Sequence, residues 1–261
     1  MPRRRRLAGW STICAGMLSL LAVSSAQQIS PSASQDEVPA LLAQLGDQDS
    51  SVKISVVHRL VQLHDNRALP VLIRLLTDDS DPEVRRNAAY ALGQLKDPRA
   101  LQPLIGSLKD EAPDVCVNSI FAVTQVAGEK RVDALIASLA HQNLHVCRAA
   151  AIGLVLLGDK NAVDPLIRSL DDTRLTVRSG AAFALGFLGD RRAVPALVRV
   201  LEDDRPLVRL SATGALSLLN DKRSLPALRR LASNDPDVQV RSRAADAVNR
   251  INQPPPRRAH P

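Results

Sequence analysis

One feature restricts the possible folds of this chain more than any other: an apolar pattern that returns about every 31 residues. Self-similarity at a period of about 20–50 residues is typical of repeat architectures. The first apolar column keeps spacings of 31 or 32 residues and comprises Val52, Val84, Val115, Val146, Val177, Val208 and Val240. A second column keeps the same period and comprises Val38, Leu69, Leu101, Val132, Val163, Val194 and Leu225. We therefore expect seven repeats over residues 37–252.

Each repeat has the pattern of two short helices. In the second repeat, one face of a first helix comprises Leu69, Leu72, Ile73 and Leu76. Asp81 suits the cap of the second helix and Pro82 its first position. Gly158, Gly189 and Asn220 favour left-handed caps at the ends of later second helices. Because one such pair cannot bury its own apolar face, the repeats must stack, which predicts an all-α solenoid.

The most regular core column is leucine in every repeat. It comprises Leu41, Leu72, Leu104, Leu135, Leu166, Leu197 and Leu228. The last repeat departs from the apolar pattern, with Arg229 and Ala232 at first-helix positions that are larger and apolar earlier. We expect this repeat to end the stack against water, as terminal repeats do.

Two segments carry a family resemblance: ALPVLIRLLTDDSDPEVRRNAAYALGQLKDPRA (68–100) and AVDPLIRSLDDTRLTVRSGAAFALGFLGDRRA (162–193). They resemble the HEAT-like repeats named after the phycobilin (phycobilisome) lyases, over about 216 of the 261 residues. The resemblance implies an α-solenoid of about seven 31-residue HEAT-like repeats. Such repeats occur in bilin lyases, in chaperones and adaptors, and in an iron-dependent hydroxylase.

The resemblance leaves the function open. The hydroxylase binds its metal through His-Glu pairs, and none of the five histidines here precedes a Glu. That activity is therefore not expected. A subunit or chaperone of a lyase-type enzyme is an alternative, which an export signal fits poorly because bilin attachment is cytoplasmic.

The first 26 residues have the layout of a secretory signal peptide. Arg3 to Arg6 precede an uncharged, largely apolar stretch from Leu7 to Val23, and Ser24-Ser25-Ala26 supplies a small-residue cleavage site. We expect cleavage after Ala26 and a periplasmic or secreted protein without membrane contact. The alternative is an uncleaved anchor, for which about 17 residues is short. Residues 27–36 are expected to form a linker and 253–261 a disordered, proline-rich tail.

Charge argues against a nucleic-acid partner. The formal net charge is +7, but four basic residues and no acidic ones lie in residues 1–26. The remainder carries 30 basic and 27 acidic residues, a net of +3. Aromatic residues, which stack on bases, make up 2% of the chain.

Two charged columns follow the repeat. The basic column directly follows the valine column and comprises Lys53, Arg85, Arg178, Arg209 and Arg241. The acidic column lies in the loops between repeats and comprises Asp65, Asp97, Asp159, Asp190 and Asp221. Stacking should align both columns as ladders, which we interpret as structural, through loop bonding and helix capping. A binding role is the alternative.

Cys116 and Cys147 replace the arginine in consecutive repeats, and His141 and His145 lie in the same turn as Cys147. Thiolate and imidazole can bind zinc or copper, so a metal site is one hypothesis. The simpler interpretation is apolar filling and ordinary turn residues, and we predict no cofactor. A disulfide is a third possibility in an oxidising compartment. Helix axes about 8–10 Å apart oppose it, because a disulfide needs Cα atoms within about 7 Å.

An outer column of the second helices points away from the core stripe. It contains Tyr90, Phe121, Ile152 and Phe183, which include three of the four aromatics beyond the leader. The flanking outward positions are uncharged, namely Val117, Thr124, Val155 and Gly186. An exposed apolar patch predicts an interaction site; the alternative is that the rings fill gaps against neighbouring helices.

The sequence has no nucleophile elbow, phosphate loop or paired-carboxylate signature that would indicate catalysis, and its many Ser and Asp residues lie in the caps and turns of the repeats. The sequence therefore predicts a non-catalytic, exported scaffold that holds a protein or peptide on the concave face of the solenoid.

Overall fold

The computed structural model describes residues 37–45 and 49–253, and these form helix pairs without a strand. The predicted leader, the linker and the tail beyond Gln253 lie outside the described residues. The helices are α2 (Glu37–Gln44), α3 (Ser50–Leu63), α4 (Leu69–Asp78), α5 (Pro82–Leu95), α6 (Leu101–Gly106), α7 (Pro113–Gln125), α8 (Arg131–Ser138), α9 (Leu144–Leu157), α10 (Val163–Ser169), α11 (Leu175–Leu188), α12 (Val194–Val200), α13 (Pro206–Leu219), α14 (Leu225–Asn234) and α15 (Val238–Asn252).

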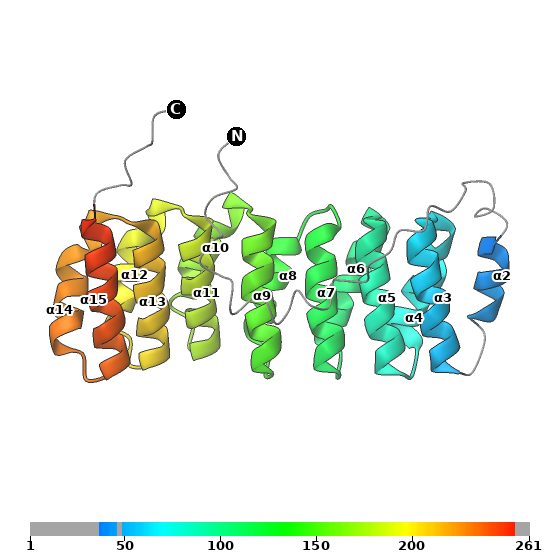
Figure 1. The fold of residues 1–261 in the computed structure, drawn as a ribbon, viewed down its shortest axis with the longest axis horizontal. Helices are drawn as coiled ribbons and strands as arrows, with labels where there is room; N and C mark the ends of the chain where they lie inside the picture. The colour runs from blue at the N-terminus through cyan, green and yellow to red at the C-terminus, as the bar shows by residue number, and fades with distance from the viewer. Residues whose placement is uncertain (1–36, 46–48, 254–261) are drawn as a thin grey trace, which may run out of the picture. The chain divides into compact units, whose positions relative to one another are not determined.

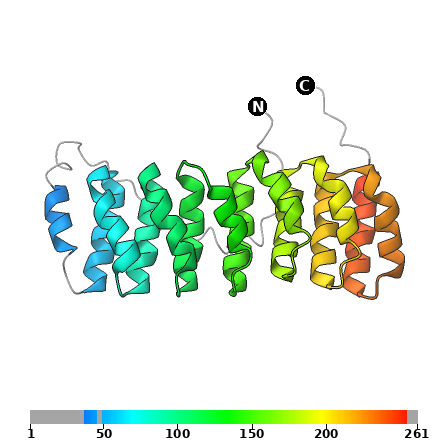
Figure 2. The ribbon, with the colours of Figure 1, turned by 180° about the vertical axis from the view of Figure 1, so that it is seen from behind.

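The helices lie in two layers, which confirms the predicted solenoid from Val38 onward. Figure 1 shows the second helices of the repeats, α3 to α15 in odd numbers, side by side. Figure 2 shows the first helices, α2 to α14 in even numbers, from the opposite side. The second helices from α3 to α15 pack on one another in chain order, and those from α5 to α15 also pack on the first helix of their own repeat. None of the described helices is long and apolar enough to cross a lipid bilayer.

Short polar side chains fix where four of the seven second helices begin. Asp49, Asp81 and Asp237 accept a hydrogen bond from the backbone N–H two residues ahead, as does Asn143 of α9. These bonds satisfy N–H groups that have no partner within the helix.

Left-handed residues fix where most of these helices end. They are His64, Lys96, Gly158, Gly189 and Asn220, which include the three residues predicted from sequence. The exceptions are α7 and α15: Val126 after α7 and Gln253 after α15 are extended, and the left-handed residue near α7 is Lys130, directly before α8.

The core follows the predicted columns. All seven members of the leucine column are buried, six of them completely. At two junctions the second helices approach closely because each contributes a small residue. A Cβ added at Gly93 would lie 2.9 Å from Cα of Ala122, and one at Gly186 would lie 2.6 Å from Cα of Ala215.

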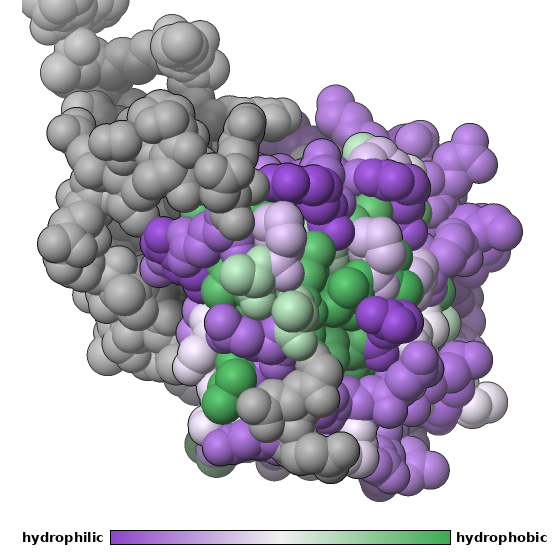
Figure 3. Space-filling view, turned by 90° about the vertical axis from the view of Figure 1, so that its right-hand side faces the viewer, coloured by the Kyte–Doolittle hydropathy of each residue, from purple (hydrophilic) through white to green (hydrophobic). Residues whose placement is uncertain are grey.

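The two terminal repeats end differently. Arg229 is exposed on the last first helix, as predicted for a terminal repeat. In the first repeat, Val52 is partly exposed, although its equivalents in the other six repeats are buried. Figure 3 faces the end formed by α2 and α3 and shows apolar side chains among polar ones there.

Candidate functional site

The outer column lies on the second-helix layer, on four successive helices that pack on one another: α5, α7, α9 and α11. Tyr90 is 39% exposed, whereas Phe121, Ile152 and Phe183 are half-buried. The rings of Phe121 and Phe183 also pack against the core. Each side chain of the column is thus partly exposed to solvent and partly buried.

The flanking positions divide into two kinds. Val117 and Val155 are half-buried beside the column. Gly186 does not belong there: it is buried against Ala215 of α13 rather than facing solvent. Our sequence interpretation of this glycine was therefore wrong, because the close approach of α11 and α13 covers it.

The apolar face extends further than the outer column. Leu156 of α9 is 58% exposed, and Phe187 of α11 is half-buried with its ring centroid 4.8 Å from that of Phe183. Leu210 and Leu218 of α13 are half-buried. We define the outer face as the solvent side of α5, α7, α9, α11 and α13.

Composition could have revealed this extension. The helices α9, α11 and α13 each contain one arginine and no lysine, aspartate or glutamate. A surface helix normally carries charges on its solvent side, so a surface helix that is almost uncharged indicates a covered surface. Leu156, Phe187 and Leu218 lie outside the single column that the sequence predicted.

Three arginines that follow the valine column form buried rungs between neighbouring repeats. Arg85 Nε lies 2.8 Å from Asp110, Arg178 Nε 2.7 Å from Asp203, and Arg209 Nε 2.7 Å from Asp235. In each, Nη1 also donates to two backbone carbonyls of the turn before its own helix. Lys53 makes the corresponding bond to Asp79 at 2.7 Å. Arg241, in the last repeat, donates to the carbonyls of Asp235 and Pro236 and has no carboxylate partner among the described residues.

The carboxylates of these rungs are not the ones that we singled out from sequence. They lie in the loop between the two helices of a repeat, at Asp79, Asp110, Asp203 and Asp235. Burial favours the neutral form of Asp110, but the bonds from Arg85 and the Ala112 N–H hold its pKa below the ordinary value. The signal was present as a second aspartate column in the sequence.

The predicted column Asp65, Asp97, Asp159, Asp190 and Asp221 lies between repeats and has a different role. Each member caps a short 3₁₀ turn by accepting from the N–H two residues ahead. In four of the five, an arginine at that position also pairs with the carboxylate, as Arg223 does with Asp221 at 2.8 Å. The bonds from Arg223 lower the pKa of Asp221 from 3.8 to about 2. These contacts make the acidic column structural.

The rung ladder is interrupted at the two cysteines. Cys116 replaces the arginine, and His141 replaces the aspartate to which that arginine would bond. His141 still makes one of the bonds that the aspartate makes in other repeats: its Nδ1 accepts a hydrogen bond from the Asn143 N–H at 3.0 Å, as Asp110 accepts one from the Ala112 N–H. At the next junction, Cys147 replaces the arginine but Asp172 remains, and Arg174 bonds this carboxylate instead. Those bonds lower the pKa of Asp172 to about 2.

Both thiols are free, buried and bonded to backbone. Cys116 Sγ donates to the Asp110 carbonyl at 3.2 Å, and Cys147 Sγ to the His141 carbonyl at 3.0 Å. Burial raises the pKa of both thiols, which favours the protonated form. His145 is exposed. Within residues 37–45 and 49–253, no three His, Cys, Asp or Glu side chains are grouped closely enough to hold a metal ion.

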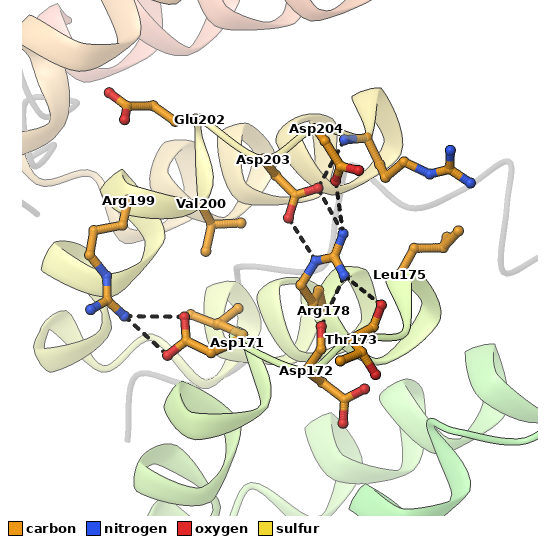
Figure 4. Close-up of a pocket in the computed structure, with 12 residues that line it drawn as sticks. Asp171, Asp172, Thr173, Leu175, Arg178, Arg199, Val200, Glu202, Asp203 and Asp204 are labelled. Carbon is orange, nitrogen blue, oxygen red and sulfur yellow. Dashed lines mark hydrogen bonds and ion pairs between the residues drawn. The ribbon is translucent and has the colours of Figure 1, made fainter.

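A cavity of about 570 Å³ lies between repeats five and six, at the loops that join their helices. Figure 4 shows that its charged groups bond one another: Arg178 joins Asp203 and Asp204, and Arg199 joins Asp171 at 3.3 Å. Since Arg178 and Asp203 at this cavity form one of the rungs, we interpret the cavity as a by-product of the rung ladder.

Comparisons with known proteins agree with the repeat architecture. The family described as HEAT repeats matches residues 38–123, 108–185 and 172–249. No curated protein sequence matches the chain.

Several solved structures match most of the chain, each with a TM-score below 0.5. Human deoxyhypusine hydroxylase in complex with glycerol is 25% identical, with 82% of this chain and 84% of that chain covered and a TM-score of 0.39. The complex of CpcE and CpcF of phycocyanin lyase from Nostoc sp. is 20% identical, with 88% and 97% covered and a TM-score of 0.47. An engineered protein is 21% identical, with 83% and 68% covered and a TM-score of 0.42.

Proposed function

The chain belongs to the HEAT-repeat family, and we propose that it is a non-catalytic scaffold that binds a protein or peptide on its outer face. The observation that carries the proposal is the lack of charge on α9, α11 and α13 outside one arginine each. Two of those arginines are used in rungs, which leaves Arg148 as the one charged side chain on the solvent side of these three helices.

Solvent exposure of this face has a cost that a partner would remove. Burial of one large apolar side chain contributes about 1.5–3 kcal/mol relative to leaving it in water. The exposed part of the face includes Tyr90 and Leu156, flanked by the half-buried side chains Phe121, Ile152 and Phe183. Contiguous apolar patches of this kind mark interaction sites.

The test compares partner capture by three forms of the full-length chain: native, Phe121→Ala with Phe183→Ala, and Val238→Ala. Val238 is a matched control because it is 65% exposed on α15, outside the outer face. We expect the native chain and the control to retain the same protein from an extract of the source cells. The double variant should lose it while staying folded at the temperature of the capture experiment; some fall in its melting temperature is expected, because both rings are half-buried against the core. Retention by the double variant, or a large fall in its melting temperature with capture intact, would show that the rings are internal packing.

The proposal includes export, based on the leader-like sequence of residues 1–26. Intact mass spectrometry of the protein from the envelope or medium should give a chain that begins at Gln27. A membrane-bound chain that retains Arg3 to Arg6 would contradict this part of the proposal.

A further inference from the structure

We infer that the partner segment is apolar and carries a carboxylate that pairs with Arg148; this inference rests on the proposed function. Arg148 lies on α9, the middle one of the five helices of the outer face. Its side chain is exposed and makes no ion pair with any described residue.

The equivalent arginine elsewhere on this face is neutralised within its own helix. Arg86 of α5 occupies the same position as Arg148 and lies 2.6 Å from Glu83. The helix α9 offers no such partner, because it contains no Asp or Glu. Arg148 is therefore a cation on a largely apolar surface, and a carboxylate of a bound segment would supply its counter-charge.

A second copy of this chain fits the face poorly. A two-fold symmetric dimer pairs a surface patch with itself. Since α9 is central, such pairing would place Arg148 close to the same arginine of the other copy. The helices α9, α11 and α13 hold no carboxylate to separate them, and Glu83 of α5 is already paired with Arg86, which leaves Asp114 of α7. Like charges brought together in an interface select against that pairing.

A carboxylate on a different chain satisfies this surface. Guanidinium binds carboxylate in a planar, two-bond geometry that fixes orientation. The surrounding side chains Ile152, Val155 and Leu156 would exclude water from that pair when covered. The apolar contacts would then supply most of the affinity, and Arg148 would select the acidic segment.

The experiment selects binders from a displayed library of random peptides, using the full-length chain as bait. Four baits are compared: native, Arg148→Glu, Arg168→Glu, and Phe121→Ala with Phe183→Ala. Arg168 is a matched control because it is an exposed arginine on α10, in the opposite layer. We expect native and Arg168→Glu baits to enrich apolar peptides that contain Asp or Glu. The Arg148→Glu bait should enrich Lys or Arg and bind the native-selected peptides about tenfold more weakly, about 1.4 kcal/mol.

The outcomes separate this inference from the proposed function. Peptides that need Phe121 and Phe183 but show no acidic preference, or bind the Arg148→Glu chain equally, overturn the inference and leave the scaffold standing. No selection by the native bait overturns both, as does binding of phosphatidylglycerol vesicles in place of peptides. A native chain that dimerises through this face, and loses the dimer on Phe183→Ala, overturns the inference in favour of self-association.

Discussion

The interrupted ladder should be repairable by two substitutions made together, Cys116→Arg and His141→Asp. At the preceding rung, Arg85 bonds Asp110 of the next repeat and the carbonyls of Asp79 and Ser80. The equivalent first carbonyl for position 116 is that of Asp110, which Cys116 Sγ already contacts at 3.2 Å. An arginine at position 116 would thus find its backbone acceptor in place. The only missing partner would be the carboxylate, because His141 stands at that position.

The magnitude follows from the burial of the existing rungs. The side chains of Arg85 and Asp110 are 8% and 10% exposed, and those of Arg209 and Asp235 are 8% and 2% exposed. Leaving one member of such a buried pair without its partner costs about 3–5 kcal/mol. We expect Cys116→Arg alone to lower the free energy of unfolding by about 3 kcal/mol, the lower end of that range. For a chain of this size that corresponds to a melting temperature lower by roughly 6–12 °C.

The assay is a double-mutant cycle on urea unfolding of native, both single variants and the double variant. The double variant should recover most of the loss, with a coupling free energy of about 3 kcal/mol between positions 116 and 141. The control combines Cys116→Arg with Cys147→Ser, an uncharged substitution of the other buried cysteine. This combination should not recover the lost free energy of unfolding. A double variant that is no more stable than Cys116→Arg alone would refute the alignment of these two positions as a rung.

Three further predictions concern the scaffold. Leu166→Ala should lower the free energy of unfolding by about 2–5 kcal/mol, because Leu166 is completely buried in the leucine column; a loss below about 1 kcal/mol in urea unfolding would contradict this placement. Gly186→Ala should cost about 1–3 kcal/mol, because its Cβ would lie 2.6 Å from Cα of Ala215. In contrast, Gly214→Ala should stabilise by about 0.5–1 kcal/mol, since its Cβ would lie 3.9 Å from the nearest atom, on Arg243; equal melting temperatures for the two variants would disprove the close approach. The pKa of Asp221 falls from 3.8 to about 2 on folding, so the stability it contributes is complete above pH 3.8 and is lost as pH falls toward 2; Arg223→Gln should flatten that part of the melting temperature against pH, and an unchanged slope would remove Asp221 as its source.

The fold was accessible from sequence because its determinants are local and repeated. A single repeat gives a weak helical pattern, but seven copies in register identify both helices, the leucine column and the left-handed ends at Gly158, Gly189 and Asn220. Each repeat contacts its neighbours alone, so no long-range pairing had to be guessed. At α7, Ala127 stands at the position that Lys96 and Gly158 occupy in the left-handed conformation in their own repeats, and Ala127 does not adopt it.

The candidate site was accessible in part. Helical geometry placed Tyr90 and Phe121 on the outward side of their helices, where both have solvent-exposed surface. It did not reveal that Leu156 is more exposed than any of them, because exposure depends on how far the neighbouring helix extends over a side chain.

By itself, the sequence determined the number of repeats, the helices, the core and the outward column, since each depends on periodicity within one repeat. The offset between stacked repeats is a tertiary property, and it decided the remainder. That offset brings Arg85 to Asp110 instead of Asp97, places His141 opposite Cys116, and covers Gly186 with Ala215. A shift of one helical turn between layers, about 5 Å, would exchange every one of these partners while leaving the repeat pattern unchanged.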